Sequence, residues 1–152
     1  MIARLTGTLV DRGTGWCILD VNGVGYEVFS PNRTLEEWAQ TGGTVTAHVS
    51  TQVAETSFSL YGFANRVDRD AFQTLLGVSG IGPKIALSTL DTFDVDSLAV
   101  AVAHDDVMAL SKINGVGKKG AQRMALELKG KLPVEFTAST TSSRRPLDRS
   151  VC

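Results

Sequence analysis

The sequence predicts an α+β fold in which a small barrel of short strands comes first and an all-α region follows. Up to Tyr61 the apolar residues fall in short segments rich in Val, Ile, Thr and aromatics, whereas after Gly62 they recur at helical spacing. The helical region also contains one pattern twice, as VSGIGPKIAL at 78–87 and INGVGKKGAQ at 113–122. These observations predict two structural regions, the second built on a repeat.

Five short segments are predicted as strands, because β-branched and aromatic residues fill them and turn residues bound them. They cover residues 2–10, 16–21, 26–29, 45–53 and 58–61. Asn22-Gly23, between the second and third segments, predicts a two-residue hairpin, since both positions of a type I′ turn need positive φ.

One helix is predicted between the third and fourth strands. Thr34 followed by Glu37 is a capping-box pattern, in which the Thr hydroxyl accepts from the N3 amide and the Glu side chain reaches back. Leu35, Trp38 and Ala39 would give this helix an apolar side. Five strands interrupted by one helix fit a closed barrel of the OB type, a fold that often binds nucleic acid, although other small barrels fit nearly as well.

The helical region is predicted to hold about five helices between Val67 and Leu132, each so short that they must share one core. The segment 98–103 also alternates like a strand, but its alanines and acidic flanks favour a helix. Helix starts are indicated by Pro83, Asp96 and Asp106.

The chain therefore divides, by prediction, into a barrel domain at 1–64, a helical domain at 65–132 and a tail at 133–152. The tail is expected to be flexible, because Ser, Thr and Arg dominate it and large apolar residues are nearly absent.

The repeated pattern is matched at its glycines and at its buried-type positions. Its paired positions are Gly80 with Gly115, Leu75 with Leu110, Val78 with Ile113, Ile81 with Val116, Lys84 with Lys119 and Ala86 with Ala121. The pattern predicts helix, tight hairpin, helix, because glycine adopts backbone angles closed to other residues. The apolar residue between the two glycines is expected to fill the small core.

A helix that begins at such a hairpin presents unpaired N–H groups and a positive dipole end, both of which favour an anion. Bare glycines let a phosphate approach those amides, and the nearby cations add direct charge. The candidate phosphate-binding residues are Gly80, Ile81, Gly82, Lys84, Gly115, Val116, Gly117, Lys118, Lys119 and Arg123. Binding through them should ignore base sequence and weaken with salt. The alternative is that both hairpins only connect helices and the lysines are solvated surface.

The charge distribution agrees with a nucleic-acid-binding second half, although the formal net charge of the chain is only -1. The first 64 residues are acidic. Cations concentrate between Lys112 and Lys131, where Glu127 is the sole acid.

Several other classes of protein are disfavoured. Gly115 to Gly120 spells G-x-G-x-x-G, but it follows helical sequence and no later strand appears, so a dinucleotide site is not expected. Cys17 and Cys152 are too few for a thiol metal site, and His48 and His104 are far apart in sequence, so we expect neither metal nor cofactor nor catalysis. No segment is long and apolar enough for a membrane span or a signal peptide, and we expect a cytoplasmic protein.

The chain resembles the RuvA family, whose members are bacterial proteins that bind Holliday junctions. The resemblance runs from Met1 to about Leu132, through MIARLTG, NGVGYEV, LYGF at 60–63, both hairpins and RMALELKGKL. It implies an OB barrel, two helix-hairpin-helix motifs, and a homotetramer that holds an opened four-way junction on one face, with one or two tetramers per junction. Its implied role is non-catalytic, in DNA recombination and repair, with the RuvB motor and the RuvC resolvase as partners.

The resemblance also implies an acidic pin, carried by the loop between the last two barrel strands at the tetramer centre. The matching loop is 52–57, where Glu55 takes the role and Thr56 replaces the second acid that the family usually has. The family ends in a linker and a domain that docks on RuvB, but this sequence ends at Cys152, within or just after the linker. We therefore expect junction binding with little stimulation of the motor. The alternative function is a general duplex-DNA-binding accessory protein without junction preference.

Overall fold

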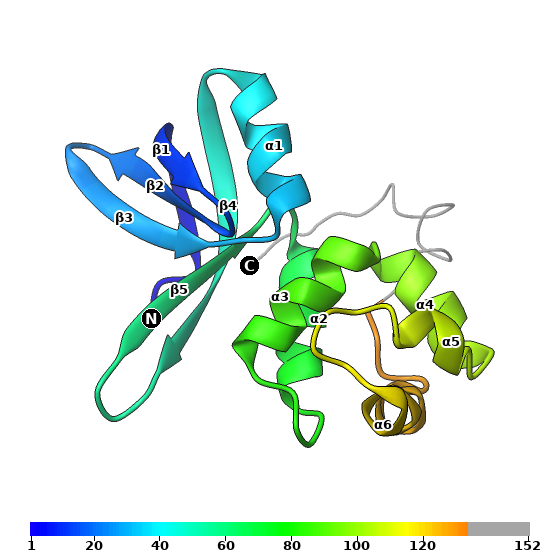
Figure 1. Ribbon diagram of the computed structural model, residues 1–152. Helices are drawn as coiled ribbons and strands as arrows, with labels where there is room; N and C mark the ends of the chain where they lie inside the picture. Colours follow the sequence, from blue (N-terminus) through cyan, green and yellow to red (C-terminus); the bar gives the residue numbers. More distant parts are fainter. Residues whose placement is uncertain (134–152) are drawn as a thin grey trace.

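The computed structural model describes residues 1–133, and within them five strands interrupted by one helix precede a run of helices, as predicted (Figure 1). The strands are β1 Arg4–Gly13, β2 Trp16–Val21, β3 Val24–Phe29, β4 Thr44–Val53 and β5 Phe58–Phe63. They close into a barrel in the order β1-β2-β3-β5-β4, with every pair antiparallel except β3 and β5. The predicted closed OB-like barrel is confirmed.

Only β2 has the predicted bounds: β4 begins one residue earlier than predicted, β5 ends two residues later, and β1 and β3 also differ. β1 continues to Gly13 because an irregularity between Leu9 and Asp11 shifts its register against β2 and allows pairing to go on. β3 begins earlier than predicted, directly after the turn at Asn22 and Gly23. The φ values of these two residues are 53° and 90°, so the predicted type of hairpin is confirmed.

The capping box predicted at Thr34 is wrong. Helix α1 spans Asn32–Thr41. Its N-cap residue is Pro31, which makes no side-chain hydrogen bond to the first turn of the helix. Thr34 instead lies inside the first turn with its hydroxyl buried and without a hydrogen-bond partner. The local pattern failed because the residue that accepts from the first turn of α1 is Asp91, far away in the sequence.

Five helices follow α1 within the described residues, as predicted. They are α2 Arg66–Leu76, α3 Pro83–Thr92, α4 Val95–Ala103, α5 Val107–Leu110 and α6 Lys118–Leu128. The segment 98–103 is helical and lies in α4.

Two of the three predicted helix starts are correct. Pro83 is the first residue of α3, and the Asp106 carboxylate caps α5 by accepting from the Ala109 amide at 3.1 Å. Asp96 is not a cap. The cap of α4 is Asp94, whose carboxylate accepts from the Ser97 amide at 2.7 Å, and that hydrogen bond lowers the pKa of Asp94.

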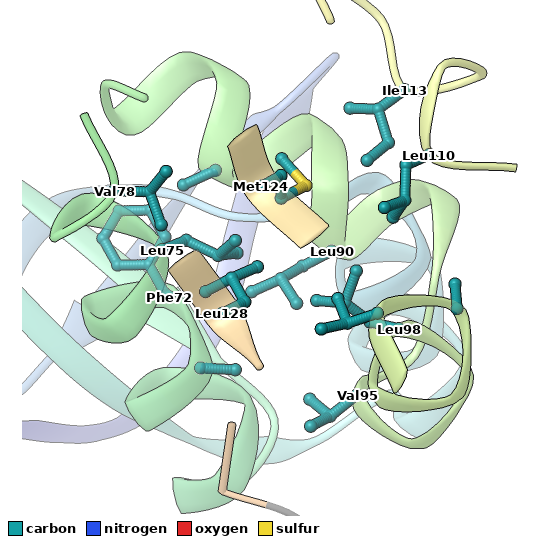
Figure 2. Close-up of a cluster of buried hydrophobic side chains, with 14 of the residues drawn as sticks. Phe72, Leu75, Val78, Leu90, Val95, Leu98, Leu110, Ile113, Met124 and Leu128 are labelled. Carbon is teal, nitrogen blue, oxygen red and sulfur yellow. The ribbon is translucent and has the colours of Figure 1, made fainter. Parts of the chain in front are cut away.

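The barrel and the helices have separate hydrophobic cores. The barrel core includes Leu19, Val28, Leu35, Ala47 and Val49. The helical core, drawn in Figure 2, includes Phe72, Leu75, Leu90, Leu98, Leu110, Ile113, Met124 and Leu128. Since none of the helices is long enough to be stable alone, this shared core holds them together.

Helix α2 joins the two halves, because it follows β5 directly and packs back against the barrel. The Phe72 ring lies 5.0 Å from the rings of both Tyr61 and Phe63, measured between centroids. Beside this aromatic cluster, the Gln73 amide donates to the Ser50 hydroxyl at 3.2 Å.

Candidate nucleic-acid interface

The first hairpin connects α2 to α3 and turns at Gly80, whose φ is +86°. Val78, just before the turn, is buried, and its carbonyl accepts from the Ile81 amide at 3.1 Å. Gly82 is extended, with φ −96° and ψ −177°, and is the N-cap of α3. The turn requires glycine at Gly80, because a side chain at positive φ is strained.

The second hairpin, between α5 and α6, repeats this geometry residue by residue. Gly115 has φ +92°, and the Ile113 carbonyl accepts from the Val116 amide at 3.0 Å. Gly117 is extended, with φ −93° and ψ −170°, and is the N-cap of α6. The structure therefore confirms that the sequence repeat is a repeat of backbone conformation.

The second glycine of each hairpin has a different use from the first. Gly82 and Gly117 have backbone angles that any residue adopts, and a Cβ built on either would meet no atom within 4 Å. Glycine is therefore not needed there for the fold. Its effect is to leave the end of the following helix bare.

The expectation that Ile81 and Val116 fill the core is correct only in part. Both side chains are partly buried and pack against the edge of the helical core. The residues that fill the core are Val78 and Ile113, which are 5% and 1% exposed. Ile81 and Val116 therefore lie at the surface where the two hairpins meet.

The helix ends at the hairpins have backbone amides without a cap acceptor. The first hydrogen bonds back to the caps are made by Ala86 to Gly82 and by Ala121 to Gly117, at 3.0 and 2.8 Å. Amides before Ala86 and before Ala121 have no acceptor within their own helix. The cap residues supply no side-chain acceptor either, since both are glycine.

The hairpins lie side by side along one cleft of about 580 Å³. A Cβ built on Gly115 would come within 3.4 Å of Ile85, at the start of α3, which shows how closely the two motifs approach. The candidate residues that line the cleft are Gly80, Ile81, Gly115, Val116, Lys119 and Arg123. Gly82, Lys84, Gly117 and Lys118 do not line it, although each lies at a helix N-terminus beside it.

Glu127 ties the two motifs together, a role that the sequence did not reveal. Its carboxylate accepts from the Ser79 amide of the first hairpin at 3.3 Å and lies 3.7 Å from the Arg123 guanidinium on its own helix. One acid on α6 thus holds the first hairpin and orients a cation of the second motif.

Glu55 lies far from this cleft. It occupies the turn between β4 and β5, is exposed, and is bracketed by a hydrogen bond from the Ala54 amide to the Ser57 carbonyl at 2.8 Å. Figure 1 shows this turn at the free end of the β4–β5 ribbon, apart from both hairpins. Within one chain, the structure does not bring Glu55 together with the other candidate residues.

The remaining titratable groups with shifted pKa values belong to the fold. Burial raises the pKa of Cys17 to about 12, which makes its thiol unreactive. Burial, followed by the positive charges of Arg69, Arg4 and Arg66, lowers the pKa of His48. Residues 1–133 contain no group of His, Cys, Asp and Glu side chains that could hold a metal ion. Among these same residues, no helix has the length and apolarity to cross a membrane.

Comparison with known proteins agrees with this geometry. Residues 1–62 match the family described as RuvA N terminal domain, and residues 72–131 match the family described as SAM-like Helix-hairpin-helix tandem. The chain is 43% identical over 146 residues to the Holliday junction branch migration complex subunit RuvA of Geobacter metallireducens, covering 96% of this chain and 73% of that protein.

Two further relatives carry the same description. The Pseudomonas fluorescens SBW25 protein is 45% identical over 85% of this chain and 64% of its own length. The Zymomonas mobilis protein is 42% identical over 86% of this chain and 62% of its own length. The chain thus spans about two thirds of the length of such relatives. With identity at this level across both the barrel and the hairpins, the chain belongs to the RuvA family.

Proposed function

We propose that this chain binds four-way (Holliday) junction DNA without regard to base sequence and holds it for branch migration. The observation that carries the proposal is the pair of hairpins, each of which ends in a glycine-capped helix N-terminus beside one shared cleft. The relatives are named as subunits of the Holliday junction branch migration complex, which supports the junction as the DNA substrate.

Each hairpin would hold a phosphate through backbone amides and the positive end of a helix dipole. Lys84 and Lys119, both second residues of their helices, would add direct charge, and Lys118 would add more at the second hairpin. Because these groups contact only the sugar-phosphate backbone, the binding free energy depends on duplex geometry and salt, and base sequence does not enter.

Junction preference would come from the barrel. We propose that the chain forms a homotetramer in which Glu55 from each subunit lies near the crossover. A carboxylate there repels phosphates and keeps the junction arms separated. Because Thr56 stands beside it, each subunit brings one acid to this loop tip.

The remaining assignments rest on the family. We propose domains at 1–64 and 65–132, which is supported by two hydrophobic cores, although Phe63 of β5 packs into the helical core. We propose a non-catalytic, cytoplasmic DNA-binding subunit whose natural partners are the RuvB motor and the RuvC resolvase. We assign no surface of residues 1–133 to the contact with RuvB.

A gel-shift titration of a four-way junction against linear duplex with the same arm sequences tests the junction proposal, with light scattering to give the mass of the protein. We expect tighter binding of the junction and a tetramer. Equal affinity for both DNAs, or a monomer in solution, would overturn the proposal in favour of a general duplex-binding protein.

The acidic pin is tested by Glu55→Lys, with Glu36→Lys, on the exposed side of α1, as the charge-matched control. Glu55→Lys should leave junction affinity nearly unchanged but bring the arms closer, measured as fluorescence energy transfer between labelled arm ends. Glu36→Lys should not move the arms. An unchanged arm geometry with Glu55→Lys would remove Glu55 from the proposal.

A further inference from the structure

The barrel and the helical domain have a second contact besides α2, where the N-terminus of α1 meets the C-terminus of α3. The Arg33 guanidinium donates from Nε to the Leu90 carbonyl at 2.6 Å. In the other direction, the Asp91 carboxylate accepts from the Arg33 amide at 3.2 Å and from the Asn32 side chain at 3.0 Å. The contact is therefore reciprocal, and each helix supplies a side chain to the end of the other.

Asp91 and Arg33 each supply a hydrogen-bond partner of opposite charge to the end of the other helix. Helix α1 has no side-chain cap of its own, and Asp91 brings a negative charge to its positive end. The Leu90 carbonyl is among the last four of α3, which have no intrahelical donor, and Arg33 brings a positive charge to that negative end. The sequence could not reveal this, because 58 residues separate Arg33 from Asp91.

The contact extends to both sides. Asn32 also accepts from the Gly15 amide at 2.8 Å, which connects Asp91 to the turn between β1 and β2. The Arg33 guanidinium lies 3.6 Å from the Asp68 carboxylate in α2, an ion pair beyond hydrogen-bonding reach. Barrel, α1, α2 and α3 are thus joined by polar groups in addition to the aromatic contact of Phe72.

The position of this contact matters because α3 connects it to the first hairpin. Its C-terminus is held by Arg33, and its N-terminus, at Pro83, carries the first hairpin. Ten residues at a rise of 1.5 Å separate the two ends by about 15 Å. If the C-terminal end of α3 shifted, the helix would tilt and the first hairpin would move relative to the barrel. Because Glu55 is part of the barrel, the distance between the hairpin and Glu55 would change too.

We infer that Arg33 and Asp91 are positioning residues that fix the hairpins relative to the barrel and so set the preference for junction over linear duplex. This inference rests on the proposed function for its DNA readout, while the interdomain geometry itself can be measured without DNA. Linear duplex needs only the hairpins, whereas a junction must meet the hairpins and the barrel loop at once.

The test uses Arg33→Ala and Asp91→Ala, with Arg33→Lys as the conservative variant that keeps a donor. The matched controls are Gln40→Ala, exposed on α1, and Thr92→Ala, which neighbours Asp91 but bonds only to its own helix. Spin labels at Val24→Cys in the barrel and Val100→Cys in α4, in a Cys152→Ser background, report the interdomain distance by pulsed electron resonance. Labelled chain is diluted with excess unlabelled chain, so that each assembly carries one labelled subunit.

The parent chain and both controls should give a narrow distance distribution, whereas Arg33→Ala and Asp91→Ala should broaden or shift it. The ratio of junction to duplex affinity should then fall by about threefold to tenfold, the effect of losing one or two partly exposed hydrogen bonds. Affinity for linear duplex should stay unchanged, and Arg33→Lys should restore most of both readouts.

The outcomes separate the two levels of the inference. An unchanged distance distribution in both alanine variants would overturn the positioning role. A broadened distribution with an unchanged junction-to-duplex ratio would overturn the link to selectivity. If the parent itself shows no junction preference, the proposed function fails, while the distance measurement still decides whether Arg33 and Asp91 hold the domains.

Discussion

The hairpins at 79–82 and 114–117 have the same backbone and different surroundings. Each turns on a glycine at positive φ, rests on a buried apolar residue two positions earlier, and ends in an extended glycine that begins a helix. After that glycine the first helix starts with Pro83, which has no N–H, whereas the second starts with Lys118. The two hairpins therefore share a backbone conformation but differ in charge. The second hairpin should be the stronger anion site.

The difference extends to how each hairpin is held. The first is tied to α6 through the hydrogen bond from the Ser79 amide to Glu127, whereas no acidic side chain within residues 1–133 accepts from an amide of the second hairpin. The second instead approaches Ile85 closely at Gly115. The two motifs thus support each other across the cleft, and a change in one should be felt by the other.

The largest effect is expected from the buried anchors. Ile113→Ala removes a side chain that is 1% exposed and should lower the free energy of unfolding by about 2 to 5 kcal/mol. Val78→Ala, the same change at the first hairpin, removes fewer atoms and should cost less. Chemical denaturation measures both. A larger loss of stability for Val78→Ala would contradict the view that both anchors are buried alike and that the cost follows the number of atoms removed.

The next effect concerns the turn glycines. Gly115→Ala and Gly80→Ala place a Cβ at φ +92° and +86°, which should cost about 1 to 2 kcal/mol each. The two changes should cost similar amounts, because the new Cβ at Gly115 would make only an ordinary van der Waals contact with Ile85 and space is open at Gly80. Gly117→Ala is the control, since its backbone angles suit any residue. Equal stability of Gly115→Ala and Gly117→Ala would contradict the assignment of the turn.

Exchanging the first helix residues should shift charge without moving the backbone. Lys118→Pro should make the second hairpin resemble the first and reduce the slope of log affinity against log salt by about one unit. Pro83→Lys should raise the slope by about the same amount. Both are read from salt titrations of DNA binding, with circular dichroism to verify the helix content. Slopes that do not move in opposite directions would show that these positions do not contact phosphate.

The smallest effect is expected at Glu127. Glu127→Ala should destabilise the protein by about 0.5 to 1 kcal/mol, because the bond from the Ser79 amide is exposed and 3.3 Å long. Glu127→Gln keeps an acceptor and should stay close to the parent. Amide hydrogen exchange at Ser79 gives the local readout. Equal exchange in both variants would contradict the tie between α6 and the first hairpin.

The hairpins could be predicted from sequence because their determinants are local. Glycine at positive φ and an apolar residue at fixed spacing determine each turn, so Gly80 and Gly115 were placed correctly in matching structures. The same locality explains the correct turn at Asn22-Gly23 and the cap at Asp106. Whether the candidate residues bind phosphate stays a prediction.

What the sequence did not reveal depends on contacts between distant segments. The capping box at Thr34 was wrong because α1 receives its negative charge from Asp91 at the C-terminal end of α3. Glu127 looked like an isolated acid among cations, and only the fold brings its carboxylate to Ser79. Periodicity and local motifs carry no information about such partners.

The central claim is that the paired hairpins bind phosphates of a four-way junction. Its most direct test is the salt dependence of junction binding for the parent, Lys84→Ala, Lys119→Ala and the double variant. Each single change should reduce the slope of log affinity against log salt by about one unit, the double change by about two, and equally for junctions of unrelated sequence. Unchanged slopes in the double variant, with the fold intact, would contradict the account.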